Sequence, residues 1–321
     1  MDKVLTRVLK NTSSYKIFER DIENSFCHAY LVISEDSFAL DNFLTLITAR
    51  VYCKNACFEC KECLKVLNDT KPDVKCLNPN QETISVKQVQ ELIEDSLLGS
   101  FESCEKLYLI KAFNKQSKDV QNKLLKTLEE PPEGVHIFLS ASSTQGILPT
   151  VLSRVKKVTL PSFPTKDIEA WLKSTGQENA SEHAQAANGS LTIAWRLAED
   201  DEFLIHAMNL LSVFNDVNSS SSVPKFIKNV AFEDLGKALE ISQIIFQDVL
   251  YVKSERPFSI TFNHLSYDYE RLADSLTLAG ISNIMNELIV CEQKYNSRVL
   301  NTNIVDCFLL KIAEEKHKCK K

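Results

Sequence analysis

Residues 106–142 read KLYLIKAFNKQSKDVQNKLLKTLEEPPEGVHIFLSAS, and this stretch decides the fold class. It begins and ends with short apolar runs, KLYLIKAF and VHIFLSAS, of the kind that form buried strands in a parallel sheet. Between them, residues 117–130 have the apolar spacing of a helix, which Pro131 and Pro132 end. A strand, a helix and a second strand in succession predict a parallel sheet with crossover helices.

The same alternation extends toward the amino terminus. CHAYLVIS (27–34) predicts a strand that leads into a helix within residues 35–53. PDVKCLNP (72–79) predicts a further strand, and SVKQVQELIEDSLLGS (85–100) predicts an amphipathic helix. We therefore expect an α/β domain with a doubly wound parallel sheet over residues 1–160.

The pattern changes after residue 160, because the remaining apolar residues recur at helical spacing only. TKDIEAWLKSTG (165–176) and SEHAQAANGSLTIAWRLAED (181–200) predict a small helical domain over residues 161–205. Residues 206–321 predict a second, larger all-α domain.

The composition limits the possible roles of the chain. A formal net charge of −6 argues against a stand-alone nucleic-acid binder, which usually has a basic surplus or a basic stripe. The sequence contains no apolar run of the roughly 20 residues that cross a bilayer, and its amino terminus lacks the apolar core of a signal peptide. We expect a cytoplasmic protein without membrane contact, whose thiols stay reduced.

Four cysteines lie within the eleven residues CKNACFECKEC (53–63). Cys53, Cys57, Cys60 and Cys63 have the spacing C-x3-C-x2-C-x2-C, which lets a compact loop surround a tetrahedral Zn²⁺ ion. Four thiolates leave no coordination position open to water, so the expected zinc site is structural. The alternative is a set of unrelated thiols in a polar loop. Core or incidental roles are expected for Cys27, Cys76, Cys104, Cys291, Cys307 and Cys319.

Residues 121–154, QNKLLKTLEEPPEGVHIFLSASSTQGILPTVLSR, resemble a segment of bacterial DNA polymerase III clamp-loader subunits. That family has the pattern N-x-L-L-K-x-L-E-E-P-P, then an apolar strand, then L-x-T-x-x-S-R-C. The matching residues here are Asn122, Leu124, Leu125, Lys126, Leu128, Glu129, Glu130, Pro131, Pro132, Leu148, Thr150, Ser153 and Arg154. The resemblance implies a RecA-like AAA+ domain with a zinc module, a helical lid domain and a helical collar domain that drives oligomerisation.

The sequence departs from the family where nucleotide chemistry would be expected. A hydrolysing subunit carries G-x-x-x-x-G-K-[ST] after the first strand, because glycine amides cradle phosphates and the lysine reaches the terminal ones. Residues 32–43 read VISEDSFALDNF, without glycine or lysine, and the acidic Glu35 and Asp36 would repel phosphate. At the end of the strand 106–110, Lys111 and Ala112 replace the family's magnesium-holding acids.

A third departure lies in NGSLTIAW (188–195), where Thr192 stands at about the place of the arginine that motor subunits present to the nucleotide. Together the departures resemble the non-hydrolysing delta-prime branch of the family, which implies that this chain binds no ATP. They also imply gamma/tau-like and delta-like subunits as partners. Contact with the sliding clamp and with primed DNA would then come through the complex.

Arg154 and Ser153 are the candidate functional pair. In the family, the Ser-Arg pair supplies an arginine finger to ATP held by the neighbouring subunit, where a guanidinium stabilises the charge of the transferred phosphoryl group. The resemblance therefore implies that Arg154 acts in trans with Ser153 in support, although Val155 replaces the usual cysteine. The alternatives are a solvated surface arginine and a local helix cap.

Two other functions stay open. The chain could be an ATP-hydrolysing gamma/tau-like motor subunit with an unorthodox phosphate loop, in which another lysine such as Lys111 serves. It could instead be a zinc-bearing nucleic-acid adaptor unrelated to replication, which the acidic balance disfavours. Glu129 and Glu130 do not form a catalytic pair in this interpretation, because adjacent helix residues point about 100° apart. We expect them to act at a helix end and an interface.

Overall fold

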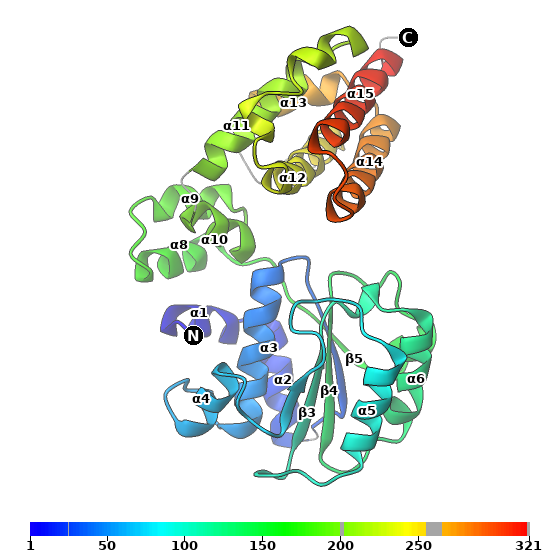
Figure 1. The fold of residues 1–321 in the computed structure, drawn as a ribbon. Helices are drawn as coiled ribbons and strands as arrows, with labels where there is room; N and C mark the ends of the chain where they lie inside the picture. The colour runs from blue at the N-terminus through cyan, green and yellow to red at the C-terminus, as the bar shows by residue number, and fades with distance from the viewer. Residues whose placement is uncertain (25, 200–201, 255–264, 320–321) are drawn as a thin grey trace. The chain divides into compact units, whose positions relative to one another are not determined.

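The computed structural model of the chain describes residues 1–24, 26–199, 202–254 and 265–319 (Figure 1). The chain forms two compact units, of which the first comprises Met1–Ser174 with Ser190–Thr192 and the second Thr175–Gly189 with Ile193–Lys321. The predicted domain limits at residues 160 and 205 stay predictions. Residues 200–201 of the predicted small helical domain, and 255–264 and 320–321 of the larger one, lie outside the described residues.

The first unit is built on a sheet in which every neighbouring pair of strands is parallel. The order of the strands is β2-β3-β4-β1-β5, so β2 and β5 are the edges. The α/β fold class predicted from the sequence is confirmed, but β5 was not predicted. It is a four-residue edge strand with two lysines, and only one of its side chains is buried. The strands are β1 (Ala29–Ile33), β2 (Val74–Cys76), β3 (Lys106–Ile110), β4 (Val135–Ala141) and β5 (Lys156–Thr159).

Helices cover both faces of the sheet, with α2 and α3 on one side and α5 and α6 on the other (Figure 1). Local signals set their ends: the Ser117 side chain caps α6 by accepting from the Val120 N–H, and α6 ends before the two prolines. The helices of this unit are α1 (Lys3–Lys10), α2 (Ser13–Asn24), α3 (Ser37–Tyr52), α4 (Lys61–Leu67), α5 (Val86–Ser96), η1 (Phe113–Lys115), α6 (Lys118–Glu129), α7 (Pro149–Leu152) and α8 (Thr165–Ser174).

The two faces of the sheet bury separate apolar layers. On one face, the ring of Phe18 from α2 packs edge-on against Tyr30 and Phe138, with centroids 5.3 and 5.8 Å away. On the other face, Leu124 of α6 and Val89 of α5 belong to one buried cluster with the strand residues. Strand β4 is buried along its whole length, as expected for a central parallel strand.

In the described residues of the second unit, the regular structure is helical and surrounds one apolar core. Its centre contains Phe214, Phe246 and Phe308, whose ring centroids lie 5.3 to 6.1 Å apart. Among the described residues, no helix is long and apolar enough to cross a membrane. The helices are α9 (Ala180–Ala186), α10 (Leu191–Glu199, which begins in the first unit), α11 (Glu202–Asp216), η2 (Ser220–Lys225), η3 (Val230–Phe232), α12 (Leu235–Lys253), α13 (Ser266–Asp274), α14 (Leu278–Asn296) and α15 (Asn301–Cys319).

The loop from β4 to α7 is fixed by polar contacts that the strand pattern does not reveal. Gln121 is fully buried; its amide donates to the Gly146 carbonyl at 2.8 Å, and its side-chain oxygen accepts from the Leu148 N–H at 2.8 Å. Gly146 has φ +88°, and a Cβ added there would lie 2.5 Å from the Asn114 carbonyl oxygen. Only glycine fits this position, and the loop in turn positions α7 and the residues after it.

We expect Gly146→Ala to lower the free energy of unfolding of the first unit by roughly 2–4 kcal/mol, because a left-handed conformation and a backbone clash add. Gly99→Ala is the matched control, since no atom lies within 4 Å of the added Cβ and φ is not in the left-handed range. Urea unfolding of the two full-length variants measures the difference. Equal stabilities would show that the loop adapts to a side chain.

Candidate functional site

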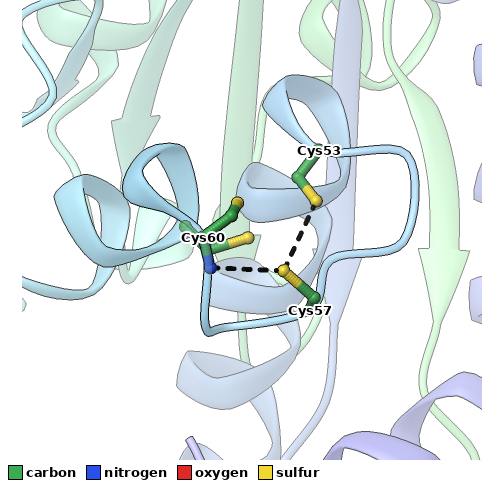
Figure 2. Close-up of side chains that lie close together, drawn as sticks. Cys53, Cys57 and Cys60 are labelled. Atoms are coloured by element: carbon green, nitrogen blue, oxygen red, sulfur yellow. Dashed lines mark hydrogen bonds between the residues drawn. The ribbon is translucent and has the colours of Figure 1, made fainter.

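The four cysteines predicted to bind zinc come together where the loop after α3 meets α4. Figure 2 shows Cys53, Cys57 and Cys60, and Cys63 lies in the first turn of α4. Their sulfur atoms all lie within 4.8 Å of one another, and the Cys53 and Cys57 sulfurs are 3.8 Å apart. Thiolates about 2.3 Å from a tetrahedral zinc would lie about 3.8 Å from one another. The cluster could therefore hold a metal ion after small rotations of the side chains.

The backbone of this loop is strained in a way that brings the sulfurs together. Ala56 and Phe58 have φ of 38° and 57°, a left-handed conformation that costs a residue with a side chain about 1–2 kcal/mol. Both side chains are buried, and this apolar burial offsets part of the cost. Cys53 ends α3 and Cys60 precedes α4, so two helices hold the ends of the loop.

The surroundings of the thiols differ along the loop. The backbone N–H groups of Glu59 and Cys60 lower the pKa of Cys57 to about 6, which favours the thiolate that a metal binds. Burial raises the pKa of Cys63 to about 12. A bound cation would favour the thiolate of the buried Cys63 by placing a positive charge beside it. Four thiolates would close the coordination shell, so the arrangement fits a structural metal.

The carboxyl end of β3, where the sequence lacks the expected acids, carries a lysine with an acidic partner. The Lys111 ammonium lies 2.8 Å from a carboxylate oxygen of Asp41 on α3. The Lys111 backbone is held on both sides, since its N–H donates to the Asn78 side chain at 2.8 Å and its carbonyl accepts from that side chain at 2.7 Å. The residue after it, Ala112, has φ 47°. This strand end therefore holds a neutralised cation in place of carboxylates that could bind magnesium.

Arg154 follows the short helix α7 and is held within its own unit. Its guanidinium donates to the Thr150 carbonyl at 2.8 Å and to the Ser153 hydroxyl at 3.1 Å, and it forms an ion pair with Glu129 at the end of α6. The side chain of Arg154 is 32% exposed and that of Glu129 is 47% exposed. An ion pair as exposed as this contributes at most about 1 kcal/mol, so the guanidinium can exchange partners at low cost.

Two of these partners, Asp41 and Asn78, were not singled out by the sequence, and the pairing of the third was not predicted. Asp41 and Asn78 meet Lys111 only through the packing of α3 and of the β2–α5 loop against β3. Glu129 was identified as a helix-end residue, but its pairing with Arg154 depends on the fold of the segment from β4 to α7. No spacing rule predicts such contacts, because they join distant segments.

Known proteins match this chain in two ways: a family model matches its amino-terminal part, and one relative matches nearly its whole length. Residues 10–164 match the family described as "DNA polymerase III, delta subunit". The DNA polymerase III subunit delta' of Bacillus subtilis (strain 168) is 22% identical over an alignment of 332 positions, gaps included, that covers 98% of each chain. The subunit delta' of Haemophilus influenzae is 28% identical over 153 residues, which cover 46% of each chain.

A solved structure supports the fold. A DNA polymerase III gamma subunit-related protein from Thermotoga maritima superposes with a TM-score of 0.51 at 17% sequence identity, covering 95% of this chain and 100% of that one. At this identity the likeness concerns the fold alone. It supports the fold of the chain as a whole.

We expect one zinc ion per chain in protein purified without chelator, and substantially less in Cys60→Ser, because three thiolates leave the shell open. Cys104→Ser is the matched control, since Cys104 is exposed and lies outside the cluster. Elemental analysis of both variants and of the wild type measures the metal. Metal-free wild-type protein, or equal zinc in Cys60→Ser, would contradict a four-cysteine site.

Proposed function

We propose that the chain, whose residues 10–164 match the DNA polymerase III delta-subunit family, is a delta-prime-type subunit of the clamp loader. In this role it helps to place the sliding clamp on primed DNA in the bacterial cytoplasm. The observation that carries the proposal is the likeness to a delta' subunit along 98% of both chains. An unrelated adaptor would not be expected to match a delta' protein from end to end, and the absence of a phosphate-binding loop after β1 favours delta' over a motor subunit.

We propose further that the chain does not hydrolyse ATP. The segment after β1 has neither the glycines nor the lysine that bind phosphates, and Lys111 at the end of β3 is paired with Asp41. A lysine at this strand end disfavours a magnesium ion there, because the two cations repel each other. The ATP sites of the complex would therefore lie on other subunits.

Calorimetry of the isolated chain with Mg-ATP is expected to detect no binding up to millimolar nucleotide. A gamma-type motor subunit under the same conditions is the positive control. Micromolar affinity that Lys111→Ala abolishes would contradict the proposal and favour the motor interpretation.

Arg154 is the residue that we propose to act on a partner's ATP, with Ser153 in support. The support from the structure is its partial exposure, its position after a loop fixed by Gln121, and the exposed ion pair with Glu129 that it can exchange for a phosphate. Its bonds to Thr150 and Ser153 orient the guanidinium without burying it. The planar fork of arginine suits a phosphoryl oxygen pair better than an ammonium does.

We expect Arg154→Ala to assemble normally and to reduce clamp-stimulated, DNA-dependent ATP hydrolysis and clamp loading by the whole complex. A finger in trans is worth about 10³ to 10⁵ in rate at one site, but the other ATP sites keep their own, so total hydrolysis falls only in part. Arg154→Lys should restore little activity. Arg20→Ala, an exposed arginine on α2, is the control of equal charge. Normal loading by an assembled Arg154→Ala complex would show that the arginine is structural.

The second unit is proposed to contribute the oligomerisation surface toward gamma/tau-like and delta-like subunits. Its helices leave several large apolar side chains exposed although the core beneath them is complete. Exposed apolar side chains at scattered positions are common on folded proteins, so the proposal rests on the family resemblance of this region, and these side chains are the candidate contacts. They include Ile205, Met208, Val230, Tyr267, Leu278, Ile289 and Leu300.

A further inference from the structure

The carboxylate of Asp36, in the loop between β1 and α3, accepts hydrogen bonds from two distant parts of the first unit. One oxygen accepts from the Ala39 N–H at 2.8 Å, from the Thr192 N–H at 3.1 Å and from the Thr192 hydroxyl at 2.6 Å. The other accepts from the Leu191 N–H at 2.5 Å and from the Ser190 hydroxyl at 3.0 Å. An ordinary helix cap needs only the Ala39 contact, so most of these bonds serve another purpose.

Thr192 completes the arrangement from the opposite side. Its hydroxyl donates to Asp36 and accepts from the Phe38 N–H at 2.9 Å. Phe38 and Ala39 lie in the first turn of α3, and Leu191 and Thr192 are the first two residues of α10. Amides in these positions have no partner within their own helix. One carboxylate and one hydroxyl therefore satisfy the amino ends of two helices at once.

The amino end of a helix binds anions, because its N–H groups point outward and the helix dipole is positive there. In a glycine-rich phosphate loop, N–H groups in this position hold a phosphate of a bound nucleotide. Here the anion belongs to the chain itself. A phosphate that approached the amino end of α3 would meet a carboxylate already bonded to its donors.

We propose that Asp36 and Thr192 form an internal anion lock that fills this position and ties the start of α10 to the start of α3 without any ligand. The proposal also explains why an acid and a threonine stand together at places where the sequence lost its nucleotide-binding residues. It is independent of the proposed replication role, because it concerns contacts within one unit of this chain.

Amide hydrogen exchange of the full-length protein tests the lock. In Asp36→Asn, the amides of Ala39, Leu191 and Thr192 should exchange about ten to a hundred times faster, because charge-assisted bonds are weakened. Glu35→Gln, an exposed neighbour with the same change in charge, should leave them unchanged. The amides of β4 report global stability. Unchanged exchange at Leu191, or equal acceleration in β4, would overturn the proposal.

A second pair of variants decides the matter if Asp36→Asn does not fold. Thr192→Val, which replaces the hydroxyl with a methyl group of similar size, should speed exchange of the Phe38 amide, and Thr192→Ser should preserve it. Equal exchange in the two variants would overturn the proposal.

An added anion gives a third readout on the wild-type protein. Inorganic pyrophosphate at constant ionic strength should change neither the exchange of these amides nor the melting temperature, because the position is filled. Increased protection of the Ala39, Leu191 or Thr192 amides by pyrophosphate would show an open anion site and contradict the lock.

Discussion

The parallel sheet of the first unit is the constraint on which the rest of the structure depends. Its central strands are buried, and each connection between parallel strands must return to the opposite end of the sheet through a helix. The carboxyl ends of all the strands therefore lie at the same end of the sheet. Asp36 follows β1, Lys111 follows β3, and the loop to α7 follows β4. Because burial of the strands stabilises the fold, the residues that follow the strands at this end of the sheet can be substituted without loss of the architecture.

At that end of the sheet, the residues that stand where a nucleotide-hydrolysing protein binds its ligand are bonded to other groups of the chain instead. Lys111 pairs with Asp41, and the Asp36 carboxylate takes up the N–H groups of two helices. In the cysteine cluster, four thiolates would use every coordination position of a zinc ion and leave none for a further ligand. Arg154 differs, because its guanidinium is partly exposed and its ion pair with Glu129 is easily exchanged. On the proposed account, the guanidinium of Arg154 is available to a neighbouring subunit, whereas Lys111 and Asp36 already have partners within the chain.

Local patterns were sufficient for much of the architecture and for the cysteine cluster. Buried strands such as β3 and β4 read as apolar runs, α6 has a cap and a proline stop, and the four cysteines lie within eleven residues. The edge strand β5 was not predicted, because it is short and carries two lysines and so lacks an apolar run. For Asp36, the sequence predicted only that its charge would repel phosphate. Its bonds to Leu191 and Thr192 were not predicted, because they join residues more than 150 positions apart. Such pairings depend on the tertiary fold, which no local pattern encodes.

The most direct test of the central claim is reconstitution with gamma/tau-type and delta-type subunits and a sliding clamp. Native mass spectrometry of the mixture measures which subunits associate, and loading of the clamp onto primed DNA is compared with and without this chain. The account predicts one complex with a fixed whole-number composition that contains the chain, and loading that fails when the chain is omitted. A chain that stays outside the complex, or full loading in its absence, would contradict the account.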